Sequence, residues 1–334
     1  MNGKFRPLLV ATMFTLGAVP FSAGLEAAPE KKEINITVFP AVLLNLVDYS
    51  MVWHGFLEKE GVTGKFVTVA NGPAMVASIL GGSSDFTAVA PVFAWQLQTK
   101  GECIRYLGTG VGSYYSLLAQ ADLDLPNLAK GFPDSIRDLK GKRIGVVARG
   151  AATEVWTGAV LKAAGLDPAK DVTFVGTGGQ ATAIAAFENK QVDVQFAYPP
   201  LSAKLAQGSY KVVANLFNSD VPTFNDMVQS GPATTCEFQQ KNPETYKAYC
   251  RAYHAAYRFV TDPKNDEAVA KDVARITGVD EAAATKLWAE FRPAFRGSRW
   301  TPQSWAAQGQ YMSPVDGKPL PEPPFDKMVA QSCE

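Results

Sequence analysis

The feature that most restricts the fold of this chain is a strand, turn and helix unit in residues 138–166. Residues 143–148 form a short, mostly apolar run bounded by turn residues, which is typical of a buried strand. From Ala152 onwards, apolar residues recur at spacings of three and four, which predicts a helix that ends at Gly165. The first amides of a helix lack partners within it and carry the positive end of its dipole. An anion placed at residues 150–153 would therefore meet several backbone N–H groups.

The same alternation continues along residues 34–216. Short apolar or β-rich runs predict strands at residues 34–39, 65–69, 85–90, 103–108, 143–148, 172–175, 192–197 and 211–216. Amphipathic stretches predict helices at residues 42–60, 71–80, 93–100, 152–163, 181–189 and 201–207. This alternation predicts an α/β fold with mostly parallel sheets covered by helices on both faces. Because the pattern restarts after a loop at residues 121–133, and because 334 residues are many for one core, we expect two similar lobes.

From residue 242 the composition shifts towards helix-forming residues. Further helices are predicted at residues 243–260, 267–277, 281–291 and 302–311, several of them opened by Asp, Asn or Thr. Residues 313–325 contain five Pro, so we expect an irregular strap at this end of the chain.

Residues 1–28 have the pattern of a cleavable secretory signal. Lys4 and Arg6 form a small positive region, an apolar run follows at residues 8–19, and small residues follow at 22–24. The apolar run is shorter than the roughly 20 residues that span a bilayer, and no other stretch approaches that length. No Cys lies near the junction to carry a lipid anchor. We therefore expect a mature protein that is free in the periplasm.

Charge and cysteine content restrict the classes of function. Lys and Arg together number 32, as do Asp and Glu, so the chain lacks the basic field that favours binding to nucleic acid. The four Cys are widely scattered and there are only two His, which argues against a zinc site. In an exported chain, an even number of Cys favours disulfides.

The residues alone leave most disulfide pairings among Cys103, Cys236, Cys250 and Cys333 open. A bond between Cys236 and Cys250 is disfavoured if residues 237–250 are helical. Such a helix would separate the two by ~21 Å at about 1.5 Å per residue, whereas a disulfide tolerates about 7 Å between Cα atoms.

A set of segments also carries a resemblance to a known family. Gly-Gly-Ser-Ser-Asp-Phe-Thr-Ala-Val-Ala-Pro at residues 81–91 follows a helix start at Asn71-Gly72-Pro73, and Asp-Leu-Lys-Gly-Lys-Arg-Ile-Gly-Val occupies residues 138–146. Further segments are residues 164–172, 191–199, 241–244 and 262–263. In this order they resemble the nitrate, sulfonate and taurine family of substrate-binding proteins of ABC transporters. The resemblance covers essentially the whole mature chain.

The resemblance implies a two-lobed, type II periplasmic-binding-protein-like fold with the ligand in the cleft between the lobes. Lobe 1 would comprise residues 33–113 and 219–334, and lobe 2 residues 114–218. The chain would cross between the lobes near residues 112–114 and again near residues 218–225. The resemblance places the strand after the second crossing antiparallel to the fourth strand, which implies a disulfide between Cys103 and Cys236 and leaves Cys250 with Cys333.

Ligands of open α/β sheets bind beyond the carboxyl ends of the strands. The candidate ligand-binding residues at these ends and at the crossings are Phe39, Pro40, Tyr49, Asn71, Gly72, Ala74, Pro91, Phe93, Tyr114, Arg149, Gly150, Ala151, Ala152, Thr153, Gln180, Tyr198 and Phe224. Two helix starts, one in each lobe, would share an anionic head group through the amides of Gly72, Ala74 and residues 151–153, and Thr153 Oγ would add a donor.

Other candidate contacts are less specific. Arg149 could add a bidentate contact to the head group, and the competing interpretation is a solvated Arg at the end of a strand. The family often has Ser at the position of Ala151 or Ala152, so this head-group site has one hydroxyl fewer than is usual in the family. Tyr114, Tyr198 and Phe224 are the preferred aromatic contacts for the rest of the ligand.

We therefore expect a monomeric, non-catalytic receptor that captures a small organic anion, such as taurine or an aromatic sulfonate or carboxylate, and delivers it to ABC permease subunits. One alternative is a protein that binds or makes the thiamine pyrimidine precursor, which by the same resemblance needs a reactive His and a tight Cys cluster. Here the Cys are scattered, and His54 and His254 lie in helical patterns. No nucleophile motif and no cofactor site is recognised. A ligand-sensing adaptor for a membrane receptor is the other alternative.

Overall fold

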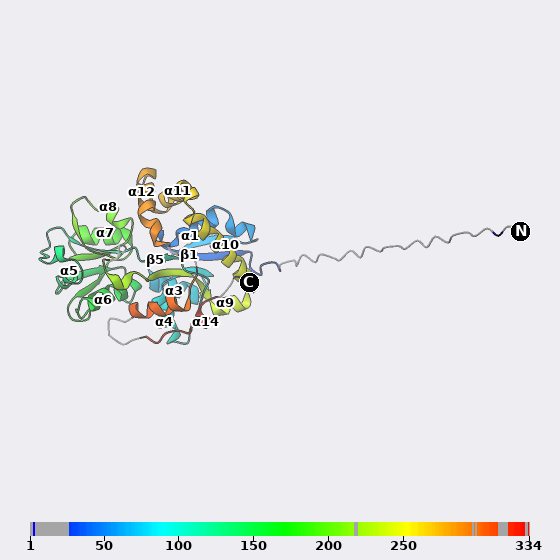
Figure 1. Ribbon diagram of the computed structural model, residues 1–334, viewed down its shortest axis with the longest axis horizontal. Helices are drawn as coiled ribbons and strands as arrows, with labels where there is room; N and C mark the ends of the chain where they lie inside the picture. The colour runs from blue at the N-terminus through cyan, green and yellow to red at the C-terminus, as the bar shows by residue number, and fades with distance from the viewer. Residues whose placement is uncertain are drawn as a thin grey trace.

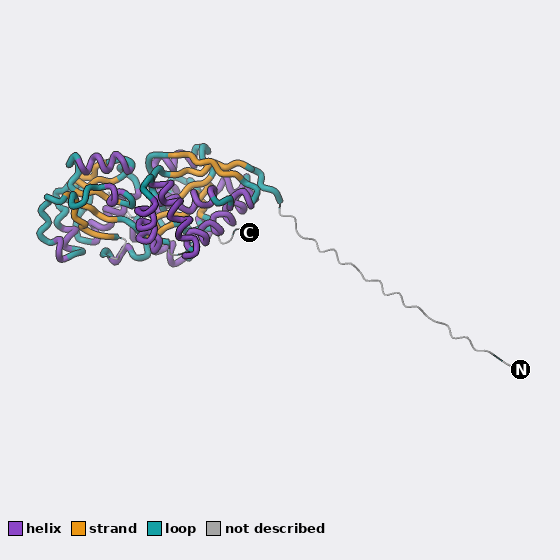
Figure 2. The backbone as a smooth tube through the Cα atoms, turned by 90° about the horizontal axis from the view of Figure 1, so that it is seen from above, coloured by secondary structure: helices purple, strands orange, loops and turns teal. Residues whose placement is uncertain are grey.

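The structure is a computed structural model that describes residues 3, 27–216, 220–295, 297, 299–312, 320–330 and 333. The predicted signal at residues 1–28 lies almost wholly outside the described residues, as does most of the predicted strap at 313–325. The described residues form two mixed sheets flanked by helices, one on each side of the view in Figure 1. Figure 2 shows the same two groups of strands from above. The predicted α/β class is thereby confirmed.

The first sheet has six strands in the order β2-β1-β3-β11-β4, with β5 also paired to β11. The strands are β1 (Glu33–Val38), β2 (Thr63–Thr68), β3 (Phe86–Val89), β4 (Ile104–Tyr106), β5 (Val111–Gly112) and β11 (Val228–Thr235). β1 pairs in parallel with β2 and β3, whereas β11 runs antiparallel to β3, β4 and β5.

The second sheet has five strands in the order β10-β6-β9-β7-β8. They are β6 (Ser116–Gln120), β7 (Arg143–Val146), β8 (Thr173–Gly176), β9 (Val194–Ala197) and β10 (Tyr210–Asn215). β7 is parallel to β8 and β9, and β6 is antiparallel to both of its neighbours. Each sheet therefore contains one reversed strand, and that strand follows the passage of the chain from the other sheet.

The reversed strands are the main departure from the expected strand pattern. No strand was expected at residues 116–120, because Ser-Leu-Leu-Ala-Gln has no β-branched residue and little strand preference. β11 contains Gly231 and Pro232, which also weaken a strand signal. The antiparallel pairing of β11 with β4, which the resemblance implied, is confirmed by the pair Thr235 and Ile104.

Helices flank both sheets. Those between strands are α3 (Gly72–Leu80), α4 (Pro91–Gln98), α5 (Asp134–Arg137), α6 (Ala152–Ala163), α7 (Gln180–Glu188) and α8 (Leu201–Lys204). The single helix expected at residues 42–60 is wrong: it is divided into η1 (Leu43–Asn45), α1 (Leu46–Trp53) and α2 (Phe56–Lys59). The break lies at Gly55, whose φ of 70° is a left-handed conformation that ends a helix.

The C-terminal helices pack beside the first sheet. They are α9 (Cys236–Lys241), α10 (Pro243–Thr261), α11 (Asp266–Thr277), α12 (Glu281–Phe291), α13 (Pro302–Ala307), η6 (Gln308–Tyr311) and α14 (Phe325–Met328). None of the helices among the described residues is both long enough and apolar enough to cross a bilayer.

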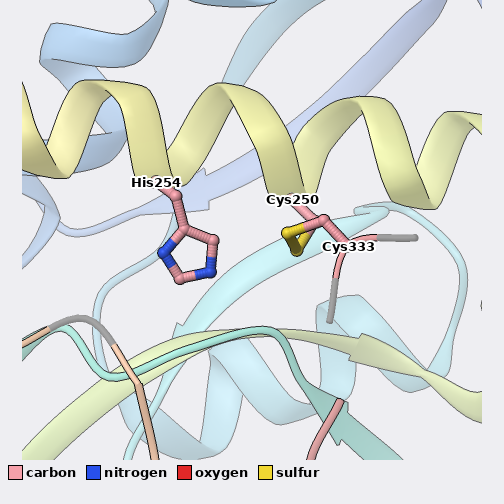
Figure 3. Close-up of side chains that lie close together, drawn as sticks. All are labelled: Cys250, His254 and Cys333. Carbon is pink, nitrogen blue, oxygen red and sulfur yellow. A yellow bond between two sulfur atoms is a disulfide. The ribbon is translucent and has the colours of Figure 1, made fainter. Parts of the chain in front are cut away.

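Two disulfides fasten these helices, and both have the expected pairing. Cys103 is bonded to Cys236 and Cys250 to Cys333, with Cα atoms 5.5 Å apart in each pair. His254 lies one helical turn from Cys250, beside the second bond (Figure 3). Because both sulfurs are in the disulfide and the metal ligand is a thiolate, this trio does not form a metal site. The Nε2 atom of His254 lies 3.0 Å from the backbone oxygen of Leu107 instead.

Candidate ligand-binding pocket

A pocket with about 750 Å³ of empty space, part of it open to solvent, lies between the carboxyl ends of the strands of the two sheets. The first sheet and its helices contribute Phe39, Pro40, Val42, Leu44, Ala70, Asn71, Gly72, Met75, Ala88, Ala90, Phe93 and Gln229. The second sheet, its helices and the connection into it contribute Tyr114, Tyr115, Val147, Ala151, Ala152, Thr153, Trp156, Gly179, Gln180 and Tyr198. A molecule in this pocket would contact both sheets.

Most of the candidate residues named from the sequence meet in this pocket. They are Phe39, Pro40, Asn71, Gly72, Phe93, Tyr114, Ala151, Ala152, Thr153, Gln180 and Tyr198. They come together because each follows one of the mutually parallel strands, β1 to β3 or β7 to β9, or lies at the crossing between the sheets.

The start of α3 forms one wall. Asn71 is the N-cap in an extended conformation, and its Oδ1 atom accepts a hydrogen bond of 2.9 Å from the N–H of Ala74. Pro73 has no N–H to offer. Among the described residues, no acceptor is found for the N–H of Gly72, which lines the pocket. Gly72 is therefore the amide of this helix that remains for a ligand.

The start of α6 forms the opposite wall, and a carboxylate of the chain already occupies part of it. The buried Glu154 accepts a hydrogen bond of 2.6 Å from the N–H of Gly150 and one of 2.9 Å from Nε of Arg149. These two donors are therefore taken. The N–H groups of Ala152 and Thr153 have no acceptor among the described residues.

The hydroxyl of Thr153 has a structural role as well. Its Oγ1 atom accepts a hydrogen bond of 3.1 Å from the N–H of Val147, which ties the end of β7 to the first turn of α6. The hydroxyl hydrogen is not used in that bond, so it is left to donate. With the amides of Ala152 and Thr153, the first turn of α6 thus offers three donors at the pocket wall.

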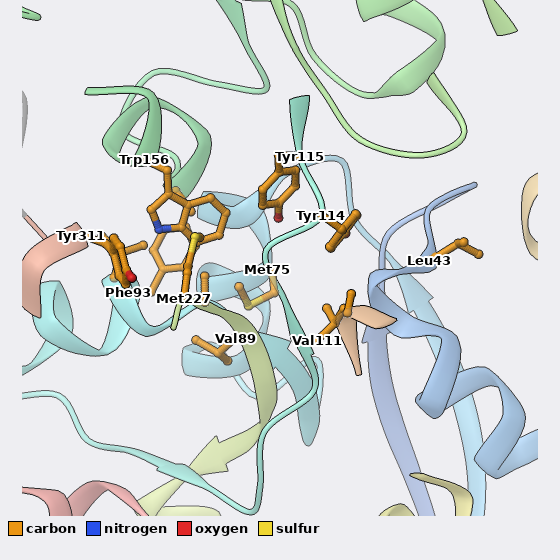
Figure 4. Packing of buried hydrophobic residues seen from close by; sticks show 14 of the residues in the cluster. Leu43, Met75, Val89, Phe93, Val111, Tyr114, Tyr115, Trp156, Met227 and Tyr311 are labelled. Atoms are coloured by element: carbon orange, nitrogen blue, oxygen red, sulfur yellow. The ribbon is translucent and has the colours of Figure 1, made fainter. Parts of the chain in front are cut away.

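Aromatic rings form much of the remaining wall (Figure 4). The Tyr115 ring lies 4.6 Å from Tyr114, 5.4 Å from Trp156 and 4.5 Å from Phe196, measured between centroids. Tyr114 also packs edge-on against Phe291 of α12, at 4.6 Å. This packing joins the crossing between the sheets to the C-terminal helices, and it fixes rings that would otherwise lose rotamer freedom on binding.

The pocket is polar in places but uncharged. Among its described lining residues there is no Asp, Glu, Lys, Arg or His. Burial raises the pKa of Tyr198 to about 12, and burial raises the pKa values of Tyr114 and Tyr115 well above the usual value for tyrosine. These phenols stay protonated at neutral pH and act as donors. Charge on a ligand would therefore be met by dipoles rather than by a counter-ion.

The remaining candidate residues lie outside the lining. Tyr49 packs on Trp53 at 4.9 Å, and Phe224 packs on Tyr311 at 5.0 Å. Pro91 is the first residue of α4. Ala74, Gly150 and Arg149 are held by Asn71 and Glu154 as described above. Arg149 has a side chain that is 64% exposed, in line with the interpretation of a solvated Arg at a strand end.

Several lining residues were not among the candidates. Trp156 is only 1% exposed, yet it lines the pocket, and its Nε1 has no hydrogen-bond partner in the described part of the chain. Gln229 lies on β11, whose weak strand signal does not predict a pocket residue. The role of Glu154 could have been found, since Glu three residues after an N-cap commonly reaches back to a free amide.

Comparison of sequences finds a relative in Brucella abortus (strain 2308) whose name proposes a binding function. The two chains are 29% identical over 229 residues, which is 68% of this chain and 66% of the relative. The match thus spans just under two thirds of that relative's length.

Solved structures with the same fold include two binding proteins. The alkanesulfonate-binding protein SsuA of Xanthomonas axonopodis pv. citri, bound to MOPS, is 20% identical with a TM-score of 0.67, over 87% of this chain and 95% of that one. The periplasmic nitrate-binding protein NrtA of Synechocystis PCC 6803 is 15% identical with a TM-score of 0.64, over 77% of this chain and 69% of that one. The fold expected from the resemblance is thereby confirmed.

The family itself is identified by a match over residues 49–266. This range is more than half of the chain, and it includes both helix starts, the crossing at Tyr114 and the reversed strand that carries Gln229. The chain therefore belongs to the NMT1/THI5-like family.

Proposed function

We propose that this protein is an extracytoplasmic solute-binding protein of an ABC importer, and that it captures a small organic monoanion with an aromatic or apolar body. The observation that carries the proposal is the pocket between the two sheets, in which helix starts from both sides present free amides and no charged side chain is found among the described lining residues.

The head group would be held by neutral donors. The N–H groups of Gly72, Ala152 and Thr153, together with the Thr153 and Tyr198 hydroxyls, supply hydrogen bonds that strengthen when the acceptor is charged. A single negative charge matches this donor set. A dianion such as sulfate would have a second charge to desolvate with no cationic side chain beside it, so we expect it to be disfavoured.

The body of the ligand would lie against the rings. The rings of Phe39, Phe93, Tyr114 and Trp156 line the pocket, and packing a ligand ring against aromatic side chains is favourable beyond the area buried. An aromatic carboxylate or sulfonate therefore fits this pocket better than a bare inorganic ion. Because the described lining residues include no Asp, Glu, His or Cys, capture is favoured over acid–base or nucleophilic catalysis.

We propose that the two sheets belong to two lobes, residues 33–113 with 219–334 and residues 114–218, that close on the ligand. The connections near residues 112–114 and 218–225 would serve as the hinge. Ligand contacts both lobes only when they are closed, and the shift towards closure equals that difference in affinity. The signal at residues 1–28 would direct the monomeric protein to the periplasm, where the closed form would meet permease subunits in the membrane.

Titration calorimetry tests the proposal. We would titrate the purified protein with taurine, an alkanesulfonate, benzenesulfonate, benzoate and an aminopyrimidine. We expect at least one aromatic monoanion to bind one-to-one, and Tyr198→Phe to weaken it about fivefold to twentyfold through loss of one donor to a charged group. The control is Tyr210→Phe, a ring on β10 outside the pocket lining, with no expected change. Failure of every monoanion to bind would refute the proposal.

A second candidate is capture of an uncharged heterocycle such as the aminopyrimidine. The observation that favours it is the set of three amide side chains in an uncharged, ring-lined pocket, namely Asn71, Gln180 and Gln229. Amides supply both donors and acceptors, as a pyrimidine edge requires. Binding of the aminopyrimidine without binding of any monoanion would select this candidate over the first.

A further inference from the structure

The last residue of α8 bridges the two halves of the molecule. Nζ of Lys204 donates a hydrogen bond of 3.0 Å to the backbone oxygen of Thr277, which is the last residue of α11. α8 belongs to the second sheet, whereas α11 packs with the helices of the first. Figure 1 shows α8 facing α11 and α12 at the top of the gap between the two halves.

The acceptor is well suited to a cation. The last carbonyls of a helix have no partner within it and carry the negative end of its dipole. Thr277 is followed by Gly278 in the left-handed conformation, whose N–H bonds to the oxygen of Ala274, so this cap leaves the oxygen of Thr277 to an outside donor. Thr277 itself is only 3% exposed, which fixes the position of its carbonyl.

The donor is connected rigidly to the pocket. Tyr198 lines the pocket, and the N–H of Leu201 donates to its backbone oxygen at 2.8 Å. Leu201 is fully buried, and the N–H of Lys204 donates to the oxygen of Pro200 at 3.1 Å. The segment from Tyr198 to Lys204 therefore has little freedom to move independently of the pocket wall.

We propose that Lys204 is a latch: its bond to Thr277 holds the two lobes in the closed arrangement and so raises the affinity for whatever ligand lies between them. This inference rests on the proposed two-lobed capture, but it concerns a contact remote from the ligand. A residue that stabilises only the closed state lowers the cost of closure, and it slows ligand release without touching the ligand.

The test uses the ligand-free, full-length mature protein, so that its outcome does not depend on the ligand's identity. Glu188 of α7 and Lys286 of α12 are both exposed, and each would be replaced by a noncanonical amino acid that carries a spin label, so that the disulfides stay intact. Pulsed electron paramagnetic resonance then reports the distance between the two halves. We expect Lys204→Met to reduce the short-distance population at least about twofold, and Lys204→Arg to retain it.

The matched control is Lys211→Met. Nζ of Lys211 donates to the backbone oxygen of Leu123 at 2.9 Å, a bond of the same kind that lies wholly within the second half. We expect its distance distribution to equal that of the wild type, with circular dichroism showing that all variants are folded. If Lys204→Met also gives the wild-type distribution, the latch is refuted, whereas calorimetry alone decides whether the proposed ligand class is right.

Discussion

Phe93 packs against Gly72 so closely that a Cβ atom added at position 72 would lie 2.5 Å from Cζ of the ring. Both residues line the pocket, and Phe93 is only 5% exposed. Gly72 is thus required by close approach rather than by an unusual backbone conformation. The ring thus packs against the first residue of α3, whose amide is free.

We predict that Gly72→Ala displaces the Phe93 ring and destabilises the protein. Overpacking of this kind costs about 1–3 kcal/mol, and urea denaturation would measure the loss. The control is Gly309→Ala on the exposed face of η6, where an added Cβ meets nothing within 4 Å. There we expect a change within about 0.5 kcal/mol. If the two variants are equally stable, the Phe93 ring moves aside without loss of stability and the prediction is wrong.

A second prediction concerns Glu154 and Arg149. Glu154→Gln weakens a buried acceptor that holds both the Gly150 amide and the Arg149 guanidinium, so we expect a loss of about 1–3 kcal/mol. Arg149→Ala should cost less than about 1 kcal/mol, because the Arg side chain is 64% exposed and the pair is screened on that side. Denaturation of both single variants and the double variant gives the coupling. A larger loss for Arg149→Ala would contradict this assignment.

Much of the pocket could be predicted because strand ends and helix starts leave local signals. Asn71-Gly72-Pro73 and the run before Gly150 mark where two helices begin, and parallel strands bring such points to one edge of a sheet. The reversed strands leave weaker signals: Gln229 lies on β11, whose place depends on pairing with residues more than 100 positions earlier. No local pattern reports such pairing.

Which of the first helical amides are already bonded within the chain could be predicted only in part, for a different reason. Whether the Gly150 amide is free depends on the rotamer of Glu154, and whether the Ala74 amide is free depends on that of Asn71. A sequence shows that a helix starts, but competition for its first amides is settled by side-chain packing. The anion site therefore has fewer free amides than the helix starts alone predicted.

A third prediction is a pH dependence of stability that arises from Asp48. Burial raises the pKa of Asp48 from 3.8 to about 6, although hydrogen bonds from Asn45 and Tyr249 oppose the shift. The folded state then binds the proton more tightly than the unfolded state, so this residue's contribution to stability falls as pH rises from about 4 to about 6. The total change is on the order of 3 kcal/mol.

Asp48→Asn removes that titration. We predict that the free energy of unfolding of the wild type minus that of Asp48→Asn decreases between pH 4 and pH 6 and is constant above about pH 7. Burial raises the pKa of the neighbouring Tyr49 to about 12 and raises the pKa values of Tyr249 and Tyr253 well above the usual value for tyrosine, so these phenols do not titrate in this window. Urea denaturation at four pH values checks the sign, and a difference that increases with pH would contradict it.

The charge preference of the pocket tests the proposed function most directly. Calorimetry of the wild-type protein would compare benzenesulfonate, its neutral isostere benzenesulfonamide and inorganic sulfate, with benzoate and benzamide as a second matched pair. We predict that at least one of the monoanions binds at least about tenfold more tightly than its neutral partner, because hydrogen bonds to a charged acceptor are the stronger ones, and that sulfate does not bind at millimolar concentration. Binding of sulfate, or equal binding of the neutral and charged partners in both pairs, would contradict a pocket built to hold one negative charge by neutral donors.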